Sequence, residues 1–108
     1  MKRRPPLDDA EKQLSLELLA AAFASLRDPD DVLAFLEDLC TPAELEAMAD
    51  RWRVVPYLRD RVPYREIHEE TKVSVTTIGR VARTLEQGTG GYRLAIKRAA
   101  RTSRKVNP

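Results

Sequence analysis

Hydrophobic residues recur every three or four positions through the first forty residues, the spacing that places them on one face of a helix. The first such stripe predicts a helix over about 9–26, which Asp8 or Asp9 can cap. The stripe consists of Leu16, Leu19, Phe23 and Leu26. Residues 1–8 show no periodicity, so we interpret them as a flexible N-terminal arm.

Two further helix starts are marked by capping residues. Asp28 precedes Pro29, a residue that suits the first helical position, so a second helix should run from there to about Cys40. Thr41 and Glu44 have the spacing of a capping box, in which each side chain accepts a hydrogen bond from the backbone amide of the other. A third helix is therefore expected to begin here.

The third helix should be long and central to the core, because its apolar positions continue over three turns. These positions are Leu45, Met48, Ala49, Trp52 and Val55. Pro56 lacks a backbone N–H and clashes with the preceding turn, so we expect a kink near Arg53 before the helix ends at about Asp60.

Two short helices joined by a tight turn follow, and together they predict a helix-turn-helix. The first should run from Pro63 to about Thr71, with Ile67 as its apolar anchor. Ser74 can cap the second, which is expected over about 75–86. The inward face of this second helix consists of Ile78, Val81, Ala82 and Leu85.

A glycine-rich segment at 88–91 ends this helix and allows the chain to reverse. A last helix is expected over about 91–101, before a basic tail over 102–108. No segment alternates in the manner of a strand. The pattern therefore predicts an all-α fold of six helices in one domain, over residues 9–101.

The composition narrows the class of protein. A chain of 108 residues buries little surface alone, so a homodimer is expected. No apolar run could span a membrane and no signal-peptide pattern opens the chain, so we expect a cytoplasmic protein. Cys40 is the one cysteine, which excludes an intrachain disulfide and suits a small buried residue. No cofactor and no metal site are predicted.

Charge is distributed unevenly along the chain. Residues 1–50 carry 5 Lys/Arg and 12 Asp/Glu, and residues 51–108 carry 14 and 5, so that −7 is followed by +9 and the net charge is +2. Such a split is typical of a protein with one surface that faces a polyanion. The alternative is a dimer whose acidic and basic halves neutralise each other.

The outer face of the 75–86 helix is unusual for a solvated helix, which would favour Glu and Lys. It presents Thr76, Gly79, Arg80 and Arg83, with Thr77 at its flank. Gly79 alone costs up to about 1 kcal/mol relative to alanine. Threonine can touch base edges and arginine can bind guanine through two hydrogen bonds. We interpret this face as a DNA-reading surface, and the alternative is a surface helix without a partner.

Other polar residues carry weaker indications. Arg65, on the preceding helix, is a candidate phosphate contact. His68 is interpreted as a polar surface residue, with a pH-sensitive role as the alternative. Basic residues near both ends of the chain could attract phosphates or only aid solubility. These are Lys2, Arg3, Arg4, Lys97, Arg98, Arg101, Arg104 and Lys105.

Three groups of residues occur along the chain in an order that is characteristic of a known family. They are Leu39-Cys40-Thr41-Pro42 with Arg51-Trp52-Arg53, then Pro63-Tyr64-Arg65-Glu66-Ile67 with Val73-Ser74-Val75-Thr76-Thr77-Ile78-Gly79-Arg80, and last Gly90-Gly91-Tyr92-Arg93-Leu94-Ala95. Over about residues 12–100 the chain resembles the Trp repressor superfamily, and within it the YerC/YecD-like branch. The resemblance implies six helices per chain. It also implies an intertwined dimer in which the first three helices and the last interlock, leaving two helix-turn-helix heads apart.

The resemblance also implies roles for single residues. The DNA-reading positions of the family correspond to Arg65, Val75, Thr76 and Gly79. The effector-pocket positions correspond to Thr41, Arg51, Arg80 and Thr84. Val81 stands where the repressor has glycine, and its side chain would fill space that an indole needs, so L-tryptophan is not expected as the effector. Lys72 stands where the turn normally has glycine, and a positive φ there would strain it.

The sequence bears on three classes of function. An enzyme is not expected, because one histidine, one cysteine and no phosphate-binding glycine motif leave no nucleophile with an evident base. A sequence-specific transcription regulator, acting as a repressor on double-stranded DNA, fits the helix-turn-helix and the charge. The alternative is a helical adaptor that binds protein through the same module. Steep salt dependence of binding to random duplex DNA would favour the regulator.

Overall fold

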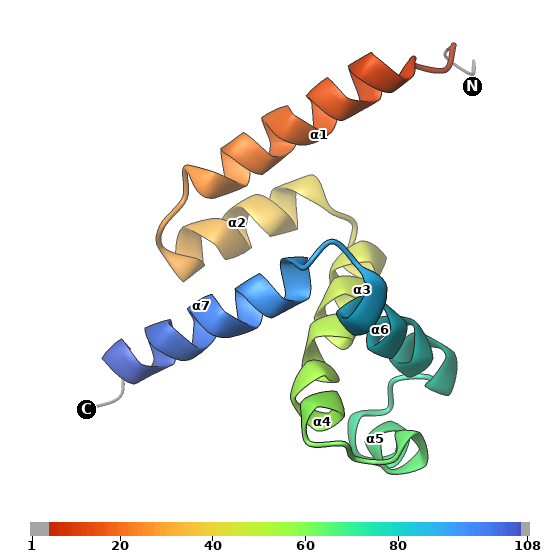
Figure 1. Cartoon of the computed structure of the whole chain (residues 1–108). Coiled ribbons are helices and arrows are strands. Elements are labelled where there is room, and N and C mark those ends of the chain that lie inside the picture. Colours follow the sequence, from red (N-terminus) through yellow and green to blue (C-terminus); the bar gives the residue numbers. More distant parts are fainter. Residues whose placement is uncertain (1–4, 107–108) are drawn as a thin grey trace. The chain divides into compact units, whose positions relative to one another are not determined.

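The computed structural model describes residues 5–106, and the side chains of residues 5–100. Within that range the chain is composed of helices and turns (Figure 1). The helices are α1 (Asp9–Ala24), α2 (Pro29–Leu39), α3 (Pro42–Arg53), α4 (Val55–Arg59), α5 (Tyr64–Thr71), α6 (Val75–Gln87) and α7 (Gly91–Val106). The predicted all-α class is confirmed. The chain falls into two compact units, residues 1–45 and 46–108.

Side-chain caps start the helices of the N-terminal unit. Asp8 and Glu11 form a capping box, with the Glu11 amide 2.8 Å from the Asp8 carboxylate. The Asp28 carboxylate accepts from the Asp30 amide at 2.9 Å and begins α2. The predicted box at α3 is confirmed, since the Thr41 amide donates to Glu44 at 2.8 Å and the Glu44 amide to the Thr41 hydroxyl at 3.1 Å.

The Thr41–Glu44 cap depends on charge. The backbone N–H of Thr41, and after it the Thr41 hydroxyl, lowers the pKa of the Glu44 carboxyl below its ordinary value. The carboxylate form therefore supports the start of α3, and this support is lost as the pH falls through the lowered pKa of Glu44.

The N-terminal unit buries no complete side chain in either α1 or α2. Phe23 and Phe35 pack their rings with centroids 4.9 Å apart and planes at 60°. Four leucines of α1 are exposed, Leu19 less than the others: Leu14, Leu16, Leu18 and Leu19. α1 ends at Ala24, two residues before the predicted end, where the Ser25 hydroxyl donates to the Ala22 carbonyl oxygen at 2.7 Å. Cys40 is partly buried at the end of α2.

The third predicted helix is divided in the structure. α3 ends at Arg53, Val54 is a turn residue, and α4 carries Pro56 in its first turn, so the expected break near Arg53 is confirmed. The expectation that this helix is central to the core is confirmed for its second part, where Val55 is 1% exposed, and was wrong for its first part, because α3 has no buried residue and Trp52 is 42% exposed. The break turns the chain, and the core begins immediately after α3.

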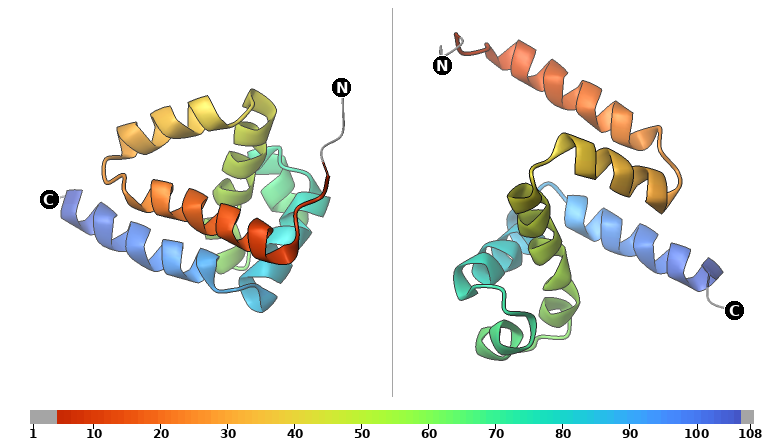
Figure 2. Two further views of the ribbon diagram at one scale, coloured as in Figure 1. Left: turned by 90° about the horizontal axis from the view of Figure 1, so that it is seen from above. Right: turned by 180° about the vertical axis from the view of Figure 1, so that it is seen from behind.

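The core of the C-terminal unit is small and consists of aliphatic side chains. It is made of Val54, Val55, Ile67, Val73, Ile78 and Val81, each at most 3% exposed. Partly buried residues of α4, α6 and α7 pack around it, among them Leu58, Leu85 and Ile96. The predicted inward face of α6 is thereby confirmed at Ile78 and Val81, with Ala82 and Leu85 partly buried. Figure 2 shows α4, α5 and α6 gathered together, with α7 running away from α5.

The junction between α6 and α7 is tight. Gly88 has no room for a side chain, since an added Cβ would lie 2.6 Å from the Thr84 carbonyl oxygen. Gly90 has a φ of 93°, which favours glycine. Across the junction, the Arg93 Nε donates to the Leu85 carbonyl oxygen at 2.9 Å. The rings of Trp52 and Tyr92 lie nearly parallel, with centroids 6.5 Å apart.

α7 continues to Val106, so the predicted end near residue 101 was wrong. No glycine or proline interrupts the sequence before Pro108, and nothing local stops the helix earlier. Of the expected basic tail, residues 102–106 are therefore helical, and residues 107–108 lie outside the described range. Residues 1–4 of the expected arm also lie outside it. None of the described helices has the length and hydrophobicity needed to cross a membrane.

Candidate nucleic-acid interface

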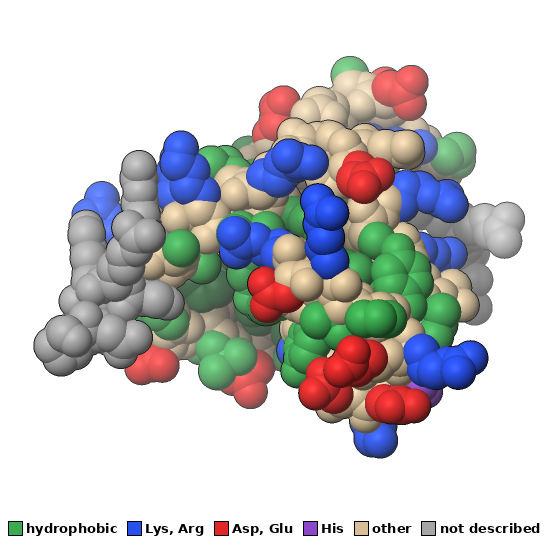
Figure 3. Space-filling view, turned by 60° about the horizontal axis from the view of Figure 1, so that its bottom comes forward, with side chains coloured by type: hydrophobic (Ala, Val, Ile, Leu, Met, Phe, Trp, Pro, Cys, Tyr) green, Lys and Arg blue, Asp and Glu red, His purple; other side chains and the backbone are tan. Residues whose placement is uncertain are grey.

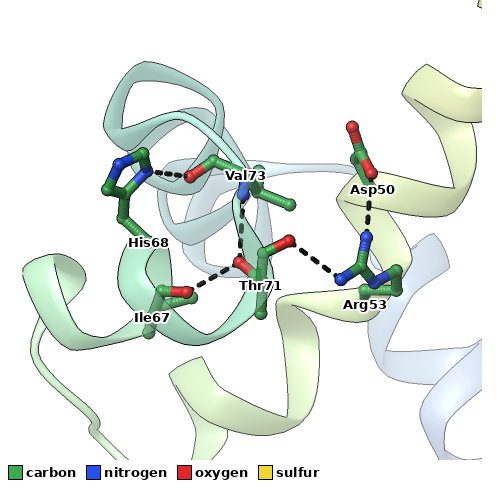
Figure 4. Close-up of polar contacts among 6 residues, drawn as sticks. All are labelled: Asp50, Arg53, Ile67, His68, Thr71 and Val73. Carbon is green, nitrogen blue, oxygen red and sulfur yellow. Dashed lines mark hydrogen bonds and ion pairs between the residues drawn. The ribbon is translucent and has the colours of Figure 1, made fainter.

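The turn between α5 and α6 is built around the buried side chain of Thr71. Its hydroxyl donates to the Ile67 carbonyl oxygen at 2.7 Å and accepts from the Val73 amide at 3.1 Å (Figure 4). Lys72 follows with a φ of 67°, which confirms the strained conformation expected there. Ser74 then caps α6 by accepting from the Thr77 amide at 3.1 Å, as predicted.

The exposed side chain of His68 also stabilises this turn. Its Nδ1 lies 2.7 Å from the Val73 carbonyl oxygen (Figure 4). Because a carbonyl oxygen can only accept, Nδ1 is the donor. The exposed His68 is thus a local support of the turn, a role that its place in the sequence did not suggest.

Arg53 links the end of α3 to the end of α5. Its Nη2 donates to the Thr71 carbonyl oxygen at 2.9 Å, and its Nη1 lies 3.3 Å from the Asp50 carboxylate (Figure 4). The last carbonyls of a helix lack partners within the helix and carry partial negative charge, so a guanidinium is a favourable cap. Sequence reasoning missed this contact, which joins residues 18 positions apart, and no local pattern signals it.

A shallow depression runs along the outer face of α6. Its lining includes Val75, Thr76, Gly79, Arg80 and Arg83, together with Tyr64 from α5. The structure thus brings together five of the seven predicted DNA-binding residues. A Cβ added to Gly79 would lie 3.9 Å from Tyr64, which is ordinary contact, so packing within the chain does not demand glycine there.

The two remaining predicted residues lie elsewhere. Thr77 is partly buried, and its hydroxyl is 3.0 Å from the Ser74 hydroxyl, so this side chain belongs to the cap of α6. Arg65 is exposed on α5 and does not line the depression. Thr77 is therefore a capping residue, and Arg65 is a cation beside the outer face of α6 rather than part of it.

The two helices of the helix-turn-helix, α5 and α6, differ in the charge of the side chains that they expose. Arg80 and Arg83 are exposed and make no ion pair with residues of the described range, and the first turn of α6 contains no acid. α5 instead exposes Glu66, Glu69 and Glu70. Figure 3 shows Lys and Arg side chains spread among hydrophobic ones, while several Asp and Glu side chains gather at one edge. As far as the described residues extend, Arg80 and Arg83 are therefore available to bind an external anion at α6.

The predicted effector-pocket residues have different surroundings in the structure. Arg80 lines the depression on α6, whereas Thr84 lines a separate hollow with Trp52 and Tyr92, and Arg51 lines neither. The Thr84 hydroxyl donates to the Arg80 carbonyl oxygen at 2.9 Å. Thr41, in the N-terminal unit, is engaged in its capping box. Val81 is 1% exposed and belongs to the core.

Two short helices, a tight turn and an outward face with exposed arginines define an all-helical protein of the helix-turn-helix class. The chain belongs to the Trp repressor family, because residues 14–100 match the family model described as Trp repressor protein. Membership supports a DNA-binding regulator at the level of the family, which is a regulator family and not an enzyme family.

Individual relatives agree with this assignment. The protein YerC of Bacillus subtilis (strain 168) is 37% identical over 87 residues, which cover 81% of this chain and 84% of that protein. A TrpR-like protein from Eubacterium eligens ATCC 27750 has a similar structure, with a TM-score of 0.76 at 35% identity over 86% of this chain and 96% of that one. A structure from Staphylococcus aureus gives 0.75 at 28% identity, over 87% and 96%. The YerC-like branch inferred from the sequence is confirmed.

Proposed function

We propose that this protein is a sequence-specific repressor of transcription that binds double-stranded DNA as a homodimer through α5 and α6. The observation that carries the proposal is the outer face of α6, where Thr76, Arg80 and Arg83 surround a glycine that internal packing does not require. A helix with small and β-branched residues on its exposed face can approach base edges closely.

In this proposal α6 lies in the major groove and α5 crosses above it. Thr76 and Val75, in the first turn of α6, contact base edges, since the N-terminal part of a recognition helix reaches deepest. Arg80 and Arg83 extend from the next two turns toward guanine or phosphate oxygens. Arg65, outside the depression, contacts the DNA backbone.

The homodimer is supported by the N-terminal unit. α1 and α2 bury no complete side chain within the chain, and exposed leucines of this kind need cover from another surface. A two-fold symmetric dimer of helix-turn-helix heads places its recognition helices about 34 Å apart, so the operator should have two symmetric half-sites one DNA turn apart.

A binding selection tests the proposal. The protein is incubated with a pool of random-sequence duplexes, the retained DNA is sequenced, and affinities for the selected and a random duplex are measured at several salt concentrations. We expect a two-fold symmetric consensus and at least about 10³-fold preference over random DNA. Equal affinity for both duplexes would contradict sequence-specific binding, and the absence of salt-dependent binding would favour the adaptor.

Base reading and phosphate attraction should separate by residue. Thr76→Ala or Arg83→Ala is expected to weaken binding to the selected duplex by about 1–3 kcal/mol with little effect on random DNA. Arg65→Ala should weaken binding to both and reduce the salt slope by about one unit. Thr89→Ala, in the α6–α7 junction, is the matched control and should change neither affinity. Equal losses on both duplexes for Thr76→Ala would show that Thr76 reads no base.

L-Tryptophan is expected to have no effect on DNA affinity. Arg80 and Thr84 line separate hollows, and the Val81 side chain already fills the core beside Arg80. Forcing a ligand into filled space costs about 1–3 kcal/mol, which stacking on arginine does not offset. Calorimetric titration with millimolar tryptophan should give no binding heat. Binding in the tens of micromolar that Val81→Gly does not strengthen would refute the steric explanation.

A further inference from the structure

Two cations occupy strained backbone positions, one before and one after α5. Arg61, two residues after the end of α4, has a φ of 58°, and Lys72, at the end of α5, has a φ of 67°. They are the two non-glycine residues with positive φ in the described part of the chain. Glycine adopts this conformation without steric penalty, whereas a residue with a Cβ does not. A feature other than stability therefore accounts for the basic side chains.

Contacts inside the chain do not explain these cations. Both side chains are exposed, and neither makes an ion pair or a hydrogen bond with a residue in the 5–100 range. A cation near a helix C-terminus is favoured by the helix dipole, but one within the last turn gives that benefit without a positive φ. Arg59 already provides it in α4.

The positions of the two residues place them beside the face proposed to bind DNA. Arg61 lines a hollow together with Tyr64 and with Ala82, Leu85 and Glu86 of α6, and Tyr64 also lines the depression of the α6 face. Lys72 stands two residues before Ser74, the cap of α6. One cation therefore lies toward the C-terminal part of α6 and the other beside its N-terminus.

The two cations flank an acidic helix. Lys72 directly follows α5, and Arg61 lies three residues before its first residue, so the helix of about 12 Å separates them together with a short segment. α5 itself exposes Glu66, Glu69 and Glu70, which repel phosphate, so the cations before and after the helix are better placed to approach the DNA strands.

We propose that Arg61 and Lys72 form a pair of phosphodiester-binding residues that hold the DNA strands flanking the groove occupied by α6. This inference rests on the proposed function and adds to it a site outside the base-reading face. The left-handed turns aim the two side chains away from the core, at a cost in stability that glycine would remove.

The test compares stability and DNA binding in the same variants. Arg61→Gly and Lys72→Gly remove the charge while suiting the backbone, and Arg61→Lys and Lys72→Arg keep both charge and strain. Lys12→Gln, on α1, controls for the loss of one charge elsewhere. Melting temperatures are measured by circular dichroism, and affinities for a selected and a random duplex are measured from low to high salt.

We expect each glycine variant to melt at or above the wild-type temperature and yet to bind both duplexes more weakly. Its salt slope should fall by about one unit for each bound subunit. The charge-conserving variants and Lys12→Gln should keep the wild-type slope. A lower melting temperature in both glycine variants would overturn the strain argument.

The outcomes separate this inference from the function on which it rests. If the wild type binds duplex DNA with a steep salt slope and both glycine variants keep that slope, Arg61 and Lys72 do not contact phosphates, and the proposed function stands. If the wild type shows no salt-dependent DNA binding, the proposed function itself fails.

Discussion

Changing Ile78 to alanine is expected to lower the free energy of unfolding of the C-terminal unit by about 2–5 kcal/mol. Ile78 is 0% exposed and is, with Ile67, one of the largest fully buried side chains. Its removal costs both the transfer of the lost methyl groups and the cavity they leave. Small domains are stable by about 5–15 kcal/mol, so this loss is a large share of the total.

Denaturant unfolding followed by the fluorescence of Trp52, the single tryptophan of the chain, measures the effect. Val75→Ala is the matched control, because Val75 lies in the same helix and is 50% exposed. That control should stay within about 0.5 kcal/mol of the wild type. Equal unfolding midpoints for the Ile78→Ala and Val75→Ala variants would contradict the assignment of Ile78 to the core.

The second large effect is expected at α1. Leu14 and Leu18, one helical turn apart, are 55% and 63% exposed in the chain by itself. Replacing both by aspartate should prevent dimer formation, since a buried unpaired carboxylate in an apolar interface costs several kcal/mol. Analytical ultracentrifugation should show roughly twice 12.3 kDa for the wild type and a single-chain mass for the variant, at low micromolar concentration.

The double variant Gln13→Asp, Ser15→Asp serves as the control for this experiment. It adds the same charge to the same helix at positions that are already polar. We expect it to remain dimeric. A wild-type protein with the mass of one chain, or a leucine variant that still dimerises, would be incompatible with a dimer formed through α1.

Local chemistry made the helix starts predictable. Asp8, Asp28, Thr41 and Ser74 are all caps in the structure, because a short side-chain oxygen directly before an apolar periodicity satisfies the first free amides of a helix. The inward positions of α6 followed from spacing in the same way. The face opposite them could therefore be predicted as well, and Thr76, Gly79, Arg80 and Arg83 from that face line one depression.

Features without a local sequence pattern could not be predicted from the sequence. The hydrogen bond from Arg53 to the Thr71 carbonyl joins residues 18 positions apart, and no local pattern of the sequence indicates the positive φ of Arg61. The apolar stripe of α3 correctly predicted a helix, but periodicity does not tell which chain covers a stripe. Trp52 is therefore exposed here although its spacing resembles that of a core residue.

The narrow span of the core has a consequence for how the molecule forms. Within the described residues, all six buried apolar side chains lie between Val54 and Val81, so the contacts among them close short loops, and folding with such local contacts is fast. In a dimer of the kind proposed, α1 gains its apolar cover only when two chains meet, at a rate that depends on protein concentration. A newly made chain would then carry a formed helix-turn-helix head before it has a partner, and assembly would follow as a separate, slower event.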